Sequence, residues 1–91
     1  MTPAERKLLK AKAHALEPVV IVGGKGLTDD VVKEVDRALT AHELIKVRAP
    51  GMDRKQRETA FASLCERTGA DAVQSIGKVF VLFRKKNAQT E

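Results

Sequence analysis

Three segments of the chain place apolar residues three and four positions apart, which is the spacing of one face of a helix. They lie before Pro18, after Thr28, and between Asp53 and Gly69. The first and third segments open with capping-box patterns, at Thr2 and at Asp53, while Thr28 can cap the second. Gly69 suits a helix C-terminus, where a left-handed residue closes the last turn. The pattern predicts three amphipathic helices, of which the first ends at Pro18.

Two segments between these helices have the composition or alternation of strands. Residues 19–22 are the β-branched run Val-Val-Ile-Val, which predicts a short buried strand. Residues 44–49 alternate, with apolar side chains on one face and Lys46 and Arg48 on the other. The second segment therefore predicts a half-buried strand whose basic side chains face water.

The end of the chain predicts a hairpin. Residues 70–75 and 78–84 are strand-like and flank a turn about Gly77. The predicted order is α-β-α-β-α-β-β, which favours an α/β domain with helices packed on a mixed sheet of four strands. A chain of 91 residues fits one domain, which we place at residues 1–84, with residues 85–91 as a polar tail.

Charge and hydropathy limit the classes of partner. Seventeen Lys and Arg face twelve Asp and Glu, which gives a net charge of +5 and favours a polyanion such as nucleic acid. The longest apolar runs, residues 18–22 and 79–83, are far shorter than the ~18 residues that identify a membrane span. The chain also lacks a helix rich in Trp, Phe and Leu for membrane-surface binding. We expect a cytoplasmic protein that does not bind membranes.

Few side chains are suited to catalysis, metal binding or base stacking. His14 and His42 lie on separate predicted helices, and Cys65 is on the apolar side of its helix, where an inert buried thiol is expected. Phe80 and Phe83 are three residues apart and so face opposite sides of a strand, which favours core packing. We therefore predict no enzyme, no metal and no cofactor.

The glycine-rich segment at residues 23–26 is the sharpest local motif. It joins a predicted strand to a helix N-terminus, where backbone amides and the helix dipole attract anions. Gly23 and Gly26 match the Gly-x-x-Gly loop with which KH domains clamp a nucleic-acid backbone, and Lys25 adds a cation. The segment matches neither the Walker nor the dinucleotide pattern. A purely structural turn is the alternative explanation of these glycines.

The first predicted helix is strongly basic. Arg6 and Lys10 are one turn apart and share a side of the helix, and Lys7 adds a further charge. Because this helix leads through a strand to the glycine loop, the sequence predicts a continuous electropositive track that would follow phosphates.

Three blocks of the sequence, residues 18–28, 41–48 and 76–84, together resemble the CRM domain family. The chain is most similar to the stand-alone bacterial proteins of the YhbY type. The resemblance implies a fold similar to the C-terminal domain of translation initiation factor three. It also implies RNA binding through the Gly-x-x-Gly loop and association with precursors of the large ribosomal subunit. The family usually has Lys directly after the first loop glycine, whereas here Gly24 stands there and Lys25 follows.

The sequence thus predicts a monomeric RNA-binding domain that acts in ribosome assembly. The alternative is a protein-interaction module whose charge serves solubility. The candidate RNA-binding residues are the loop residues Gly23, Gly24, Lys25 and Gly26, the helix residues Arg6, Lys7 and Lys10, and the secondary contacts Lys46, Arg48, Lys78 and Arg84.

Overall fold

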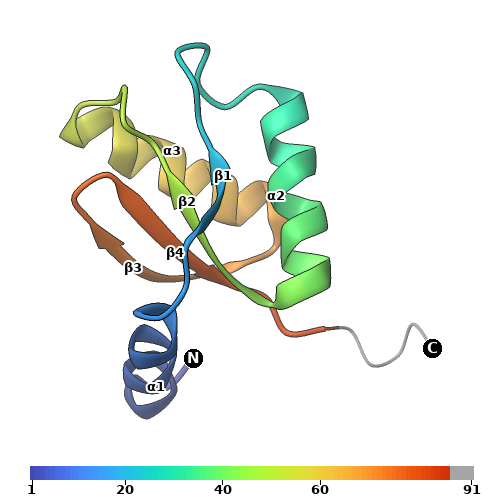
Figure 1. Cartoon of the computed structure of the whole chain (residues 1–91), viewed down its shortest axis with the longest axis vertical. Helices are drawn as coiled ribbons and strands as arrows, with labels where there is room; N and C mark the ends of the chain where they lie inside the picture. The colour runs from blue at the N-terminus through green and yellow to red at the C-terminus, as the bar shows by residue number, and fades with distance from the viewer. Residues whose placement is uncertain (87–91) are drawn as a thin grey trace.

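All seven predicted elements are present in the computed structural model, which describes residues 1–86 (Figure 1). Their order is the predicted α-β-α-β-α-β-β. The elements are α1 (Pro3–Ala13), β1 (Pro18–Ile21), α2 (Asp29–His42), β2 (Leu44–Arg48), α3 (Arg54–Thr68), β3 (Asp71–Ile76) and β4 (Val79–Phe83).

The four strands form one mixed sheet in the order β1-β2-β4-β3. β1 pairs in parallel with β2, while β2–β4 and β3–β4 are antiparallel. The β3–β4 hairpin turns at Gly77, whose φ of 55° is accessible to glycine without steric cost. The prediction of a mixed four-stranded sheet is confirmed.

Helices α2 and α3 cover one face of the sheet and build the main core. Phe80 of β4 is fully buried there, and its ring stacks on Phe61 of α3 with the ring centroids 4.8 Å apart. Both phenylalanines therefore serve packing, as predicted for Phe80. The other large, fully buried side chains of this core are Val22, Val35, Leu39, Ile45, Val47, Leu64 and Leu82.

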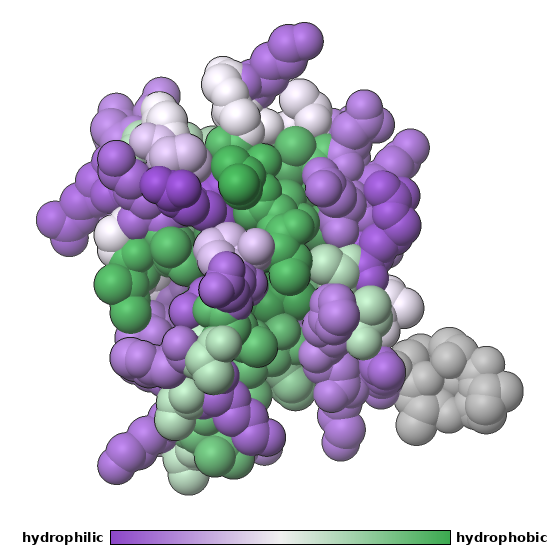
Figure 2. Space-filling view, in the orientation of Figure 1, coloured by the Kyte–Doolittle hydropathy of each residue, from purple (hydrophilic) through white to green (hydrophobic). Residues whose placement is uncertain are grey.

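Helix α1 packs on the opposite face and covers only one end of it (Figure 1). Ala13 is buried there against Val73 and Val81, with Leu9 and Phe83 alongside. The rest of this face carries no helix among the described residues, and we call it the open face. A band of apolar surface runs down the middle of the molecule between polar margins (Figure 2).

The predicted helix caps are confirmed by their geometry. The side chain of Thr2 accepts a hydrogen bond from the Glu5 amide, and the Glu5 carboxylate accepts one from the Thr2 amide. Asp53 and Gln56 exchange the same pair of bonds at the start of α3. Gly69 ends α3 in the left-handed conformation, with φ of 74°.

Two predictions about the first third of the chain are wrong. Helix α1 ends at Ala13 rather than Pro18, because the hydrogen bonds after it have three-residue spacing, as in the bond from the Leu16 amide to the Ala13 carbonyl. Strand β1 is half-buried rather than buried: Val20 lies in the core, while 60% of Ile21 is exposed. The cause is its edge position on a sheet whose open face has no cover at that end.

The predicted polar tail begins with two residues that the structure describes. The backbone amide of Lys86 donates a 2.8 Å hydrogen bond to the Glu43 carboxylate at the junction of α2 and β2. The remaining residues of the predicted tail, 87–91, lie outside the described part of the chain. In residues 1–86, none of the helices has the length and apolar character needed to cross a membrane.

Candidate nucleic-acid interface

The glycine loop projects from the end of the sheet opposite α1 (Figure 1). It is a tight turn, closed by a 3.0 Å hydrogen bond from the Gly26 amide to the Gly23 carbonyl. Lys25 lies exposed within the turn, and no salt bridge holds it in the described part of the chain. The loop therefore presents a mobile cation and backbone to solvent.

Only one of the three loop glycines is explained by the fold. Gly26 has a φ of 74°, a conformation that side chains with a Cβ adopt at a steric cost. Gly23 and Gly24 do not have positive φ, and a Cβ at either position would meet nothing within 4 Å. Neither backbone strain nor packing requires glycine there, so the purely structural turn accounts for only part of the motif.

The helix that follows the loop has an N-terminus that is less suited to an anion than the sequence predicted. The Thr28 side chain already accepts a hydrogen bond from the Val31 amide, so it caps α2. Asp29 and Asp30 stand in the first turn, and their carboxylates oppose an incoming anion. Asp29 is also paired with Arg67 at 2.8 Å. The attraction for an anion at this end rests on the loop and on nearby cations.

A row of four paired residues crosses the open face next to the loop. Strand pairing places Ile21 beside Arg48, Arg48 beside Val79, and Val79 beside Ile76. Paired residues share a face of the sheet, and the alternation of buried residues places this row opposite the core. Arg48 is exposed between aliphatic neighbours, and Ile76 is 55% exposed. We call these four residues the loop-side row.

Lys46, Val81 and Gln74 pair across the strands one step nearer α1. Lys46 reaches the segment that follows α1, where its Nζ donates a 3.0 Å hydrogen bond to the Leu16 carbonyl. Lys46 also lines a groove of about 160 Å³ between α1 and the sheet, together with Lys10. The structure thus brings Lys10 and Lys46 together, while Arg48 lies one step closer to the loop.

The continuous electropositive track predicted from the first helix to the loop stays a prediction, and its route crosses the sheet. Helix α1 and the glycine loop lie at opposite ends of the sheet, so the open face separates them (Figure 1). Positive charge passes from Lys10 through Lys46 and Arg48 towards the loop instead. Lys78 joins it at the hairpin, where its carbonyl accepts a 2.7 Å hydrogen bond from the Ala49 amide and its side chain is exposed.

Arg6 has a structural task that the sequence did not reveal. Its Nη1 donates hydrogen bonds to the carbonyls of Ala72 and Val73, where the register of β3 shifts. The guanidinium thus satisfies backbone acceptors at an irregularity of the sheet and fixes α1 to β3. Lys7, one residue further along, is exposed, so these two candidates differ in role.

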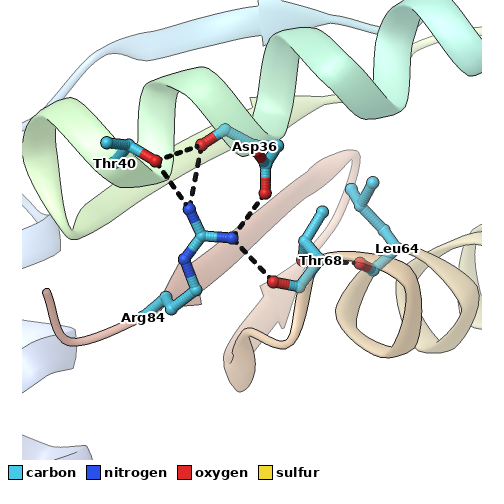
Figure 3. A network of polar contacts seen from close by, with 5 residues as sticks. All are labelled: Asp36, Thr40, Leu64, Thr68 and Arg84. Carbon is cyan, nitrogen blue, oxygen red and sulfur yellow. Dashed lines mark hydrogen bonds and ion pairs between the residues drawn. The ribbon is translucent and has the colours of Figure 1, made fainter. Parts of the chain in front are cut away.

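Arg84 is also held by protein groups (Figure 3). Its Nη1 donates to the Asp36 carboxylate at 2.6 Å and to the Thr68 carbonyl at 2.7 Å. Its Nη2 donates to the Asp36 carbonyl and the Thr40 hydroxyl. The guanidinium therefore links α2 to the C-terminus of α3, on the side of the sheet away from the open face. We assign it a structural role.

Sequence reasoning missed the apolar members of the open face. The sequence placed Ile21 in a buried strand, Val79 in a hairpin strand and Ile76 next to the turn. Only the strand pairing shows that these three residues share one surface with Arg48. The two-residue alternation within each strand already indicated which residues share a face of that strand. Combining these residues into one surface requires the order of the strands in the sheet, which the order of the strands along the chain does not give.

Cys65 lies outside this surface, and its thiol has low reactivity. Burial raises the pKa of the Cys65 thiol to about 11, with a smaller contribution from Asp71, so the thiolate is scarce near neutrality. Among residues 1–86, no group of three or more His, Cys, Asp or Glu side chains is placed to hold a metal. The chain is thus a small mixed α/β domain that presents an exposed glycine turn and a basic open face.

Comparison with known proteins identifies the family of this domain. The model of the CRS1/YhbY (CRM) domain family matches residues 1–84, and the chain belongs to that family. An RNA-binding protein of Haemophilus influenzae is 42% identical over 84 residues, which cover 92% of this chain and 85% of that protein. A Pseudomonas aeruginosa protein named "probable RNA-binding protein" is 42% identical over 85 residues, covering 93% and 82% of the two chains.

A solved structure supports the same assignment. The solution structure of a hypothetical protein from Staphylococcus aureus superposes with a TM-score of 0.84 at 28% sequence identity. The match covers 96% of this chain and 91% of that one. Both the family resemblance and the α/β fold predicted from the sequence are therefore confirmed.

Proposed function

We propose that this protein binds RNA through the backbone of its glycine loop and the basic residues of its open face. The observation that carries the proposal is the pair Gly23 and Gly24, which the fold does not require to be glycine. A phosphate can approach backbone amides closely only where no Cβ intervenes. Lys25 beside them supplies a mobile charge, and relatives with the same domain are named RNA-binding proteins.

Free cations on the open face and in the β3–β4 turn extend the contact beyond the loop. Arg48 and Lys78 are exposed, and no salt bridge neutralises either of them in residues 1–86. Lys10 and Lys46 add charge at the α1 end. Arg6 and Arg84 stay outside this set because each guanidinium makes at least two hydrogen bonds to protein acceptors, whereas Lys46 makes a single exposed one.

The loop is tested by adding a negative charge where the fold has room for it. Gly24→Asp meets no neighbour and needs no strained backbone, so the protein is expected to stay folded. Losing a charge-assisted contact should weaken RNA binding about ten- to a hundredfold. Gly51→Asp is the matched control, since Gly51 is an exposed loop glycine with equal space and the substitution changes the net charge equally. Equal affinities of the two variants would show that the loop is only a turn.

We further propose that the RNA belongs to precursors of the large ribosomal subunit and that the protein acts in their assembly in the cytoplasm. The support is membership of the CRM family, whose stand-alone bacterial members the sequence resembles. Crosslinking in cells, followed by sequencing of the attached RNA, tests this proposal. Crosslinks concentrated in large-subunit precursor RNA are expected, and crosslinks spread over unrelated transcripts would contradict it.

A further inference from the structure

The groove between α1 and the open face is lined partly by apolar side chains and an amide, which contacts to phosphates do not require. Its lining includes Ile76 and Val79, a cross-strand pair of the loop-side row, which form an apolar wall. Lys10, Lys46 and Gln74 line the same groove, so polar groups surround this wall. None of the residues lining the groove is acidic.

The groove suits one flat group rather than a whole small molecule. Its volume is about 160 Å³, whereas pockets for drug-sized ligands and cofactors usually span ~300–1,000 Å³. Gln74 carries both hydrogen-bond donors and an acceptor on one amide, which is what the edge of a nucleobase requires of a partner. Lysine ammonium groups can donate only.

We propose that this groove receives an unpaired base of a single-stranded RNA segment. Its face would lie against Ile76 and Val79, and its edge would meet the Gln74 amide. The neighbouring phosphates would lie along Lys46 and Arg48 towards the glycine loop. This inference rests on the proposed RNA binding and names the class of RNA, because bases in a duplex are stacked and paired and cannot enter a groove.

Charge is the reason to assign the groove to RNA rather than to an apolar protein segment. Two lysines line it, and Arg48 stands in the loop-side row between Ile21 and Val79, of which Val79 lines the groove. A guanidinium plane can itself stack on a base, and apolar contacts fill the space around it. An apolar peptide would desolvate these cations without neutralising them.

The test compares a ten-nucleotide single-stranded RNA with the same strand in a duplex, by fluorescence anisotropy. The full-length wild-type protein is expected to bind the single strand more tightly. The double variant Ile76→Ala with Gln74→Ala should lose about tenfold in affinity for the single strand and little for the duplex. Leu8→Ala is the matched control, because Leu8 is 56% exposed and Ile76 55%, and Leu8 lies outside the groove.

The outcomes separate this inference from the proposed function. Equal wild-type affinity for both RNAs, or wild-type affinity in the double variant, would overturn the groove assignment and leave backbone binding intact. Absence of binding to either RNA would overturn both. Should the double variant unfold, the methyl resonances of Ile76 and Val79 in the wild-type protein decide: shifts on adding the single strand support the assignment, and unchanged signals refute it.

Discussion

Arg84→Met tests whether Arg84 stabilises the fold or binds RNA. Arg84 is the last residue of the third sequence block that resembles the CRM family, residues 76–84. The substitution keeps the apolar stem and removes the guanidinium that joins Asp36 and Thr40 of α2 to the Thr68 carbonyl of α3. We expect a loss of stability with little change in the RNA affinity of the folded protein. The sequence alone had predicted a secondary RNA contact at this position.

The magnitude follows from the exposure of each partner. The Arg84 side chain is 24% exposed and that of Asp36 53%, so we count their ion pair as about 1 kcal/mol. The part-buried bond to the Thr68 carbonyl adds about 1–1.5 kcal/mol, and the two exposed bonds a few tenths each. The sum is about 2–3 kcal/mol, which corresponds to a fall in Tm of roughly 8–24 °C for a domain of this size.

Urea unfolding followed by circular dichroism measures the loss, with Lys85→Met as control because Lys85 is exposed. The control is expected within about 0.5 kcal/mol of the wild type, as is usual for a surface substitution. The RNA affinity is compared at a temperature where both variants are folded. Wild-type stability of Arg84→Met together with a tenfold loss of affinity would refute the structural role and restore the RNA contact.

Three further predictions concern other parts of the chain. Arg6→Ala should lower the free energy of unfolding by about 1–2 kcal/mol in urea titrations, because the carbonyls at the β3 irregularity lose their donor, while Lys7→Ala should not. Glu43 has φ of 66°, so Glu43→Gly should raise stability by about 1 kcal/mol, and Glu43→Ala, which keeps the strain, should not. Cys65 has a pKa raised to about 11 from 9.0, so its alkylation by iodoacetamide should increase with pH up to about 11 in the folded protein and level off near 9 in urea. Because the folded pKa is the higher one, the stability from the buried thiol is complete below pH 9 and is lost as the pH rises through about 11.

Local signals in the sequence predicted the elements well because each has a local cause. Thr2, Thr28 and Asp53 satisfy helix-end amides within three residues, and Gly69 takes a conformation that favours glycine. The order of the elements then limits the fold to helices on a mixed sheet. Such causes do not depend on the rest of the chain.

The candidate site was only partly predictable because its members meet through strand pairing. The β-branched run that contains Ile21 predicts a buried strand. Ile21 is exposed because β1 lies at the edge of the sheet and α1 packs at the other end of the open face. Arg6 and Arg84 likewise read as free charges. The partners Ala72 and Asp36 are 66 and 48 positions away in the sequence, beyond the reach of any local pattern.

The salt dependence of RNA affinity tests the central claim most directly. We assign five cations to phosphates: Lys10, Lys25, Lys46, Arg48 and Lys78. Each phosphate neutralised on a single strand contributes about −0.7 to the slope of log affinity against log salt, so five contacts predict a slope of about −3.5 for wild-type protein and single-stranded RNA. A slope near zero, at any affinity, would contradict binding through the RNA backbone.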